Sequence, residues 1–265
     1  MTSLSPAVAD AARSRWPDRA AAWIDALPRE LAELCDSLAV TPTGRTFPAG
    51  SAHVVEAATG TGARVVLRST PDPDAAAQAA VLERLADAGL APAVHGVRHT
   101  EAGTWTAMDA ITPGTSFAER EPTPSNLTAV TTMLRTLSAE DGPPSVPSVV
   151  PWLRARLVDL PADDQPPHRG AALDMLDQLA AGSGSGLCHA DLSPRNVLHG
   201  DSRLWFIGPR GMNGEAAYDV AVLALELSFD DLHTAHALAR SIALTSGLDG
   251  DRASAWVTVV AAATV

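Results

Sequence analysis

The sequence predicts an α+β fold with two lobes, a small lobe built on antiparallel strands and a larger helical lobe after it. Short runs rich in β-forming residues, separated by turn signals, are concentrated between residues 54 and 111. From residue 124 onward, apolar residues recur mainly at helical spacing. We therefore expect N-terminal helices and the β-rich lobe in residues 1–114, and the helical lobe in residues 115–265.

The first lobe begins with helical sequence and continues as short strands. Residues 7–38 carry apolar side chains at helical spacing, which we expect to be interrupted near Pro17 and Pro28. Two strand-like runs, 54–58 and 64–68, are joined by Thr59-Gly60-Thr61-Gly62, which is typical of a hairpin turn. The lobe is completed by a predicted helix over 74–88, predicted strands over 92–97 and 104–111, and a turn at 112–114.

The second lobe is predicted to be mainly helical, with one polar loop in its middle. Apolar periodicity predicts helices over 124–138, 148–158, 167–181, 215–228, 231–246 and 251–264. The loop 188–196 follows an apolar lead-in and precedes two short apolar runs that a turn at 200–202 separates. We expect these runs to be strands that hold the loop in place.

The acidic composition excludes some classes of partner. The net charge of −12 argues against a nucleic acid, whose phosphates demand a basic surface, and would suit a cationic small molecule. An acidic surface that only keeps the protein soluble is the alternative. No stretch approaches the roughly 18 consecutive apolar residues of a membrane span. Because Cys35 and Cys188 fit no CxxC spacing, we expect a reduced, cytoplasmic protein, whose oligomeric state is left open.

The polar loop carries the pattern His189-x-Asp191-x-x-x-x-Asn196. A carboxylate and an amide five positions apart on such a loop can serve one phosphoryl-transfer site. Asp191 would orient the attacking hydroxyl group and accept its proton, and the side-chain oxygen of Asn196 would ligate a magnesium ion. His189 would fix the loop by hydrogen bonds to the neighbouring backbone.

Residues 189–198 and 207–221 resemble the aminoglycoside phosphotransferases, especially the branch with streptomycin and hydroxyurea phosphotransferases. The likeness extends over about residues 45–230 but is specific only around 187–221. It implies a protein-kinase-like bilobal fold, ATP and Mg²⁺ as cofactors, and phosphorylation of a hydroxyl group on a small molecule. It also implies that Asp219 braces the catalytic loop through backbone N–H groups.

The resemblance places nucleotide-binding residues in the first lobe. Arg68 stands where kinases keep a phosphate-binding lysine, and the chain contains no lysine. Gly50 and Ser51 precede a strand and would cradle a phosphate, although any hairpin turn could look the same. Met108 opens a segment that looks like the hinge between the lobes of the family. These four residues are therefore expected to contact ATP.

The resemblance also indicates which residues would balance the charges of the nucleotide and its metal ion. Gln78 occupies the slot of a glutamate that pairs with the kinase lysine, and Asp74 lies one turn earlier and could compensate for it. The family has Ile-Asp-Pro where this chain has Ile207-Gly208-Pro209, so the principal magnesium ligand is absent. Losing such a contact typically costs on the order of 3–4 kcal/mol. We therefore expect Gly208, Arg68 and Gln78 to impair or alter phosphoryl transfer, while the base Asp191 is retained.

Three hypotheses follow for the function. The first is an ATP-dependent small-molecule O-phosphotransferase. The second is an ATP-independent cyclase, dehydratase or lyase of a biosynthetic pathway, with no cofactor and with Asp191 as general acid or base in a closing cleft. The third is a non-catalytic pseudokinase that binds a partner. Asp230 and Asp231 resemble the acidic residues on the substrate side of aminoglycoside-modifying enzymes, and they equally suit the start of a helix.

Overall fold

The computed structural model describes residues 4–120, 122–159, 168–181, 183, 185–229 and 231–263. The contacts within the chain divide it into two compact units. The first unit consists of Met1–Ala79 and Pro92–Ala110, and the second of Ala80–Ala91 and Ile111–Val265. Helix α3 (Ala75–Asp87) contributes residues to both.

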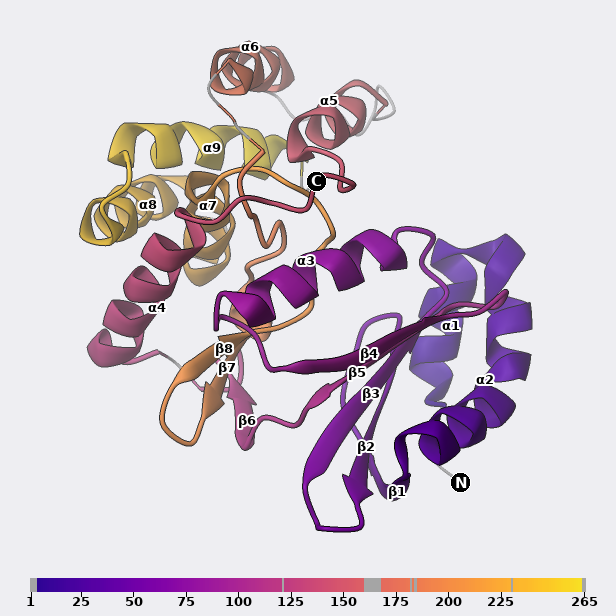
Figure 1. The fold of residues 1–265 in the computed structure, drawn as a ribbon. Helices are drawn as coiled ribbons and strands as arrows, with labels where there is room; N and C mark the ends of the chain where they lie inside the picture. The colour runs from indigo at the N-terminus through magenta and orange to yellow at the C-terminus, as the bar shows by residue number, and fades with distance from the viewer. Residues whose placement is uncertain are drawn as a thin grey trace. The chain divides into compact units, whose positions relative to one another are not determined.

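The first unit is built on one antiparallel sheet (Figure 1). In the described residues its strand order is β1-β2-β3-β5-β4. The strands are β1 (Val40–Thr46), β2 (His53–Thr59), β3 (Arg64–Thr70), β4 (Val94–His99) and β5 (Thr104–Asp109). The register pairs Val55 of β2 with Leu67 of β3, and Leu67 in turn with Ala107 of β5. These side chains are buried, so one face of the sheet supplies the core of this unit.

Helices α1 (Pro6–Arg15) and α2 (Pro17–Leu38) precede the sheet, and α2 packs against its buried face. Two tryptophan side chains connect helix and sheet by hydrogen bonds. Trp23 Nε1 of α2 donates to Ser69 Oγ at 2.9 Å, and Trp105 Nε1 of β5 donates to Glu30 Oε2 at 2.8 Å. Buried indole N–H groups need such partners, and these two contacts therefore fix how α2 lies on the sheet.

The predicted interruption of the N-terminal helix near Pro28 is wrong, because α2 runs without a break from Pro17 to Leu38. Pro28 is exposed, whereas Leu27 and Leu31 on the adjacent face are buried in the core. Burial of that face outweighs the loss of one backbone hydrogen bond at the proline. The predicted break at Pro17 is confirmed: the proline begins α2, where its missing N–H costs nothing.

Strands β1 and β6 (Pro113–Ser116) were not predicted. Apart from Val40, the residues of β1 are exposed, so its sequence shows no alternation of apolar and polar residues. Strand β6 lies where a turn was expected at 112–114. It pairs antiparallel with β7 (Val197–Gly200), with Ser116 opposite Leu198. Both strands lie at the edge of a sheet, where pairing with one neighbour suffices.

The second unit is mainly helical and contains a small sheet of order β6-β7-β8, in which β8 is Leu204–Phe206. Its helices agree with the predicted ones to within two residues at either end. They are α4 (Pro124–Leu137), α5 (Val149–Asp159), α6 (Arg169–Ala180), α7 (Ala216–Leu227), α8 (Leu232–Ser246) and α9 (Gly250–Ala263). Figure 1 shows α7, α8 and α9 grouped together, and Tyr218 of α7 packs edge-on against Trp256 of α9. An antiparallel sheet followed by helices confirms the predicted α+β class.

Among the helices that the structure describes, none combines the length and the apolar character needed to cross a lipid bilayer.

Candidate active site

The loop 187–196 is held by a buried carboxylate from the first turn of α7. Asp219 is fully buried, and its carboxylate accepts hydrogen bonds from the backbone N–H groups of His189 and Ala190, both at 2.8 Å. Burial raises the pKa of Asp219 to about 7, against the opposing effect of these two donors. Ala190 has a φ of 61°, a left-handed conformation that is uncommon for a residue with a Cβ atom. The two hydrogen bonds thus hold the backbone in a strained turn directly before Asp191.

The His189 side chain connects the loop to the residue that follows β8. Its Nε2 lies 2.8 Å from the carbonyl oxygen of Ile207, and its Nδ1 lies 3.3 Å from the backbone N of Asp191. Because a carbonyl can only accept and an N–H can only donate, these partners assign the tautomer with the proton on Nε2. Burial lowers the pKa of His189 to about 4, so the ring is neutral near pH 7.

Asp191 is half-buried, with its side chain 42% exposed. Its Oδ1 accepts a hydrogen bond of 2.9 Å from Arg210 Nη2. The Nδ2 group of Asn196 donates to the main-chain carbonyl of Asp191 at 2.6 Å and lies 3.4 Å from Oδ2. The structure thus brings Asp191, Asn196 and His189 together on one loop, as the motif predicts.

Arg210 is the residue of this site that the sequence analysis did not single out. Besides Asp191 it contacts the loop twice: its Nε donates to the Ala190 carbonyl at 3.3 Å, and its backbone N–H donates to the His189 carbonyl at 3.0 Å. Its guanidinium carbon lies 4.9 Å from the ring centroid of Trp152. Only its position close to Gly208 in the sequence could have drawn attention to it.

Gly208 lies beside Asn196, where the magnesium ligands were expected. Its φ is 65°, and a Cβ atom built on it would lie 3.3 Å from Asn196 Oδ1. A carboxylate at position 208 would therefore stand next to the amide oxygen. Without it, Asn196 offers one neutral oxygen, and the described residues contain no group of three or more His, Cys, Asp or Glu side chains placed to hold a metal. The residues present do not fit a magnesium ion held by the protein.

In the first unit, Arg68 belongs to a short chain of polar contacts. Its Nη2 donates to Gln78 Oε1 at 3.2 Å, and Gln78 Nε2 donates to Asp72 Oδ2 at 2.8 Å. The expected contact between Arg68 and Gln78 is present. The compensating carboxylate, however, is Asp72 and not Asp74, whose backbone N–H donates to Asp72 Oδ1 at 2.9 Å. Burial lowers the pKa of Arg68, and the charge of Asp72 opposes that effect.

The other predicted nucleotide contacts are also in the first unit. Gly50 and Ser51 lie in the connection between β1 and β2. A Cβ atom on Gly50 would meet nothing within 4 Å, and its φ is not left-handed, so neither space nor backbone conformation requires a glycine there. Met108 lies on β5, is 7% exposed and is paired with Val66 of β3.

Of the two candidate substrate carboxylates, the structure describes only Asp231. Asp230 lies outside the described residues. Asp231 is the N-cap of α8, where its side chain accepts from the His233 N–H at 3.2 Å and from Thr234 Oγ1 at 2.6 Å. The Thr234 hydroxyl and the His233 N–H lower the pKa of Asp231. The structure therefore gives Asp231 a capping contact, and the residue does not line the cavity described next.

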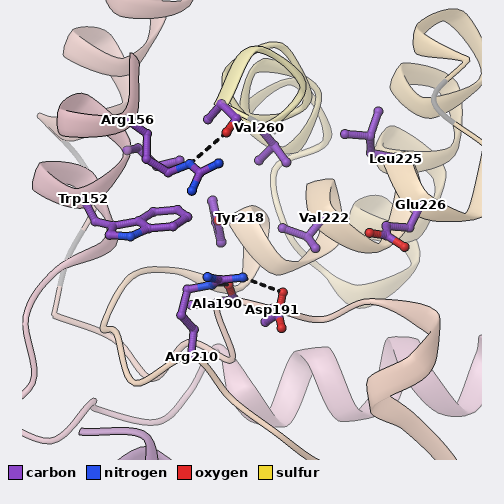
Figure 2. A pocket seen from close by; sticks show the side chains of 12 residues that line it. Trp152, Arg156, Ala190, Asp191, Arg210, Tyr218, Val222, Leu225, Glu226 and Val260 are labelled. Carbon is purple, nitrogen blue, oxygen red and sulfur yellow. Dashed lines mark hydrogen bonds and ion pairs between the residues drawn. The ribbon is translucent and has the colours of Figure 1, made fainter. Parts of the chain in front are cut away.

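A cavity of about 130 Å³ opens beside Asp191, within the second unit (Figure 2). Helices α5, α7 and α9 and the loops of Asp191 and Arg210 form its wall. Its lining residues are Trp152, Leu153, Arg156, Ala190, Asp191, Arg210, Tyr218, Val222, Leu225, Glu226, Val260 and Ala263. The cavity therefore joins the candidate base to a pocket that combines apolar side chains with the charged groups of Arg156, Arg210 and Glu226.

A sequence model of the phosphotransferase enzyme family (APH) matches residues 43–255. No curated protein matches the sequence. Solved structures with the same fold include choline kinase LicA from Streptococcus pneumoniae, at 17% identity and a TM-score of 0.58, covering 80% of this chain and 78% of that one. A thermostable mutant of aminoglycoside phosphotransferase APH(4)-Ia, in a ternary complex with AMP-PNP and hygromycin B, has 18% identity and a TM-score of 0.59, covering 86% and 87%.

Amicoumacin kinase hAmiN, in complex with AMP-PNP, Ca²⁺ and Ami, is similar at 14% identity and a TM-score of 0.53, covering 77% of this chain and 70% of that one. At these identities the solved structures establish the fold, which is kinase-like. The family match spans most of the sequence and includes both the loop 187–196 and Gly208. The chain belongs to the APH phosphotransferase enzyme family.

Proposed function

We propose that the protein transfers a phosphoryl group from ATP to a hydroxyl group of a small molecule, with Asp191 as the base. The observation that carries the proposal is the position of Asp191, at a cavity and on a loop that Asp219 and His189 hold. A carboxylate in this position can accept a hydrogen bond from the hydroxyl group and then its proton as the oxygen attacks the phosphoryl group. Relatives solved with AMP-PNP and a small molecule support the reaction class.

His189 and Asp219 are positioning residues in this proposal. The neutral imidazole fixes the backbone N–H of Asp191 without adding a charge next to the base. Asp219 keeps Ala190 in its left-handed conformation and so directs the following side chain toward the cavity. A base held in one orientation reacts faster than a mobile one, because less ordering is needed in the transition state.

For the nucleotide we propose Arg68, with Gly50, Ser51 and Met108 as further contacts. A guanidinium can bind a phosphate through two parallel hydrogen bonds, so the replacement of lysine does not remove phosphate binding. The amide of Gln78 holds one edge of that guanidinium and is itself held by Asp72. Arg68 is thus oriented by a neutral group where kinases use a charged one, which leaves its positive charge available to a phosphate.

Phosphoryl transfer is expected to be slow, because no carboxylate stands at position 208. The loss of one preorganised electrostatic contact typically lowers turnover by a factor on the order of 10²–10³. The same observation favours a second candidate function, an ATP-independent enzyme in which Asp191 is the general acid or base. In that case Arg210 would be the charge partner of Asp191 throughout the reaction.

Calorimetry with ATP and Mg²⁺, followed by turnover assays against a panel of hydroxylated small molecules, separates the candidates. The phosphotransferase proposal expects nucleotide binding and ADP release that Asp191→Asn lowers by at least a hundredfold. Asp201→Asn is the matched control, because it removes a carboxylate from an exposed turn between β7 and β8.

Absence of nucleotide binding together with an Asp191-dependent conversion would overturn the phosphotransferase proposal in favour of the ATP-independent enzyme. A protein that binds a ligand equally well as wild type and as Asp191→Asn, with no conversion of any substrate, would overturn both.

A further inference from the structure

Trp152 of α5 lies between two arginine side chains at the wall of the cavity (Figure 2). The guanidinium carbon of Arg156 is 5.2 Å from the centroid of its ring, and that of Arg210 is 4.9 Å away. A guanidinium within about 6 Å of an indole ring is attracted to the negative face of the ring. Trp152 thereby holds Arg210, the partner of Asp191, on one side of its ring and Arg156 on the other.

The charges that line the cavity are not equally compensated. Arg210 pairs with Asp191 at 2.9 Å, and Glu226 has Arg195 at 3.7 Å. Arg156 donates from Nε to the Ala263 carbonyl at 2.9 Å, which is a neutral partner. Among the described residues, Arg156 forms no ion pair with a carboxylate. The end of the cavity at Arg156 is therefore positive, although the whole chain is acidic.

The rest of the cavity limits the size of a ligand and favours one with an apolar central part. Its apolar lining comes largely from α5, α7 and α9, through Leu153, Val222, Leu225 and Val260. Its volume of about 130 Å³ is well below the ~300–1,000 Å³ of sites for drug-sized ligands. Such a space suits one small apolar body, such as a single ring, with polar groups at its ends.

We infer that this cavity binds a small hydroxy acid, with the anionic group at Arg156, the apolar body on α7 and α9, and the hydroxyl group at Asp191. A guanidinium matches a carboxylate or phosphate through two parallel hydrogen bonds, and the free edge of Arg156 offers them. The inference rests on the proposed function and names the substrate class of that site. It departs from the cationic ligand that the net charge would suit, because the charge at the Arg156 end of the cavity is positive.

Three ring-matched probes test the inference: 4-(hydroxymethyl)benzoate, 4-(hydroxymethyl)benzamide and 4-(hydroxymethyl)benzylamine. They share a ring and a hydroxyl group and differ in charge, from anionic through neutral to cationic. Binding to the full-length protein is measured by ligand-observed NMR without nucleotide, so the result does not depend on turnover. The benzoate is expected to bind at least tenfold more tightly than the other two.

Arg156→Gln is expected to reduce the affinity for the benzoate to that for the benzamide, while leaving the benzamide unaffected. Arg154→Gln is the matched control, because Arg154 lies on the same helix, pairs with Asp177 and does not line the cavity. Equal affinity for all three probes, tighter binding of the benzylamine, no binding of any of them, or equal effects of the two variants would overturn the inference.

Failure of the anion site and failure of the phosphotransferase proposal would give different results. Selective, Arg156-dependent binding of the benzoate by a protein that never turns over ATP would support the anion site and contradict the phosphotransferase. Turnover of ATP by a protein that does not distinguish the three probes would support the phosphotransferase and contradict the anion site.

Discussion

The guanidinium of Arg210 donates a 2.9 Å hydrogen bond to the carboxylate of Asp191, nineteen residues earlier in the chain. The contact engages Oδ1, while Oδ2 lies 3.4 Å from Asn196 Nδ2. In the proposed reaction the hydroxyl group would approach Oδ2, which is the oxygen that Arg210 does not contact. Arg210 would thus orient the proposed base.

Replacing Arg210 by glutamine is expected to lower turnover on the order of tenfold without changing the KM for ATP, because the base loses its orientation and the nucleotide loses nothing. A double-mutant cycle with Asp191→Asn should show a coupling of roughly 0.2–1 kcal/mol in the free energy of unfolding, since both side chains are partly exposed. Arg203→Gln is the control, because Arg203 also lies over a tryptophan, Trp205, but contacts no catalytic residue. Additive effects of the Arg210 and Asp191 changes would contradict the orienting role.

Aspartate at position 208 is expected to create a metal site together with Asn196. The backbone there has a φ of 65°, which aspartate and asparagine tolerate better than other non-glycine residues. Its Cβ would lie 3.3 Å from Asn196 Oδ1, so two oxygen ligands would face one position. Gly208→Asp should tighten Mg²⁺-dependent ATP binding in calorimetry and raise turnover on the order of a hundredfold.

Gly208→Asn is the matched variant for this experiment, since it has the same shape and backbone preference but no charge. Only the aspartate variant should respond to Mg²⁺. If both variants behave alike, the absence of a carboxylate at position 208 is not what limits phosphoryl transfer.

His189 should remain neutral far below the pH at which an ordinary histidine is protonated. Its pKa in the folded protein is about 4, against 6.5 in an unperturbed histidine, because the ring is buried. Because the pKa of His189 is lower in the folded protein than in the unfolded chain, its contribution to the free energy of unfolding is fully present above pH 6.5 and is lost as the pH falls toward 4. The difference between the two pKa values corresponds to at most about 3 kcal/mol of that free energy.

The measurement for His189 is an NMR titration of the histidine Cε1–H resonances, with His189→Gln to identify the signal. The His189 resonance should not shift above pH 5. A titration near pH 6.5 would show that the ring is solvated and that the contacts to Ile207 and Asp191 do not hold it.

Most of the helices could be predicted because each buries one face, which leaves a 3.6-residue period in the sequence. Strands β1 and β6 could not, because all residues of β1 but Val40 are exposed and β6 is a four-residue strand that begins at a proline, so neither carries an apolar alternation. Pro28 was misleading because local preference predicts a break, whereas burial of the adjacent face of α2 depends on tertiary packing. Elements whose formation depends on distant partners are thus the ones that local patterns miss.

The same distinction between local and distant partners applies to the residues of the candidate site. Asp191, Asn196 and the missing carboxylate at Gly208 lie within a short segment, where spacing alone brings them together. Arg210, Trp152 and Arg156 meet at the cavity from a loop and a helix that are far apart in the sequence. Asp72, and not Asp74, is the partner of Gln78; both residues lie before the first residue of α3, where the helical spacing behind the prediction does not apply.

The left-handed backbone at Ala190 leads to a last prediction, which concerns stability. A left-handed φ costs a residue with a Cβ roughly 1–2 kcal/mol, and glycine avoids that cost. Ala39, the C-cap of α2, has a φ of 51° and is exposed, so Ala39→Gly should raise the free energy of unfolding by about 1 kcal/mol. Ala190→Gly should give a smaller gain, because this methyl group is 2% exposed and its packing is lost.

Urea denaturation compares these variants with Ala22→Gly, at an exposed position inside α2, which should lose about 0.5–1 kcal/mol. The free energy of unfolding is thus expected to rise for Ala39→Gly and to fall for Ala22→Gly. This contrast separates the effect of the left-handed backbone from any general effect of adding a glycine. If Ala190→Gly is destabilised as much as Ala22→Gly, the turn before Asp191 is not strained. A gain in stability accompanied by slower turnover would instead mean that the strained alanine keeps the base in its reactive orientation, because glycine lets the loop sample other conformations.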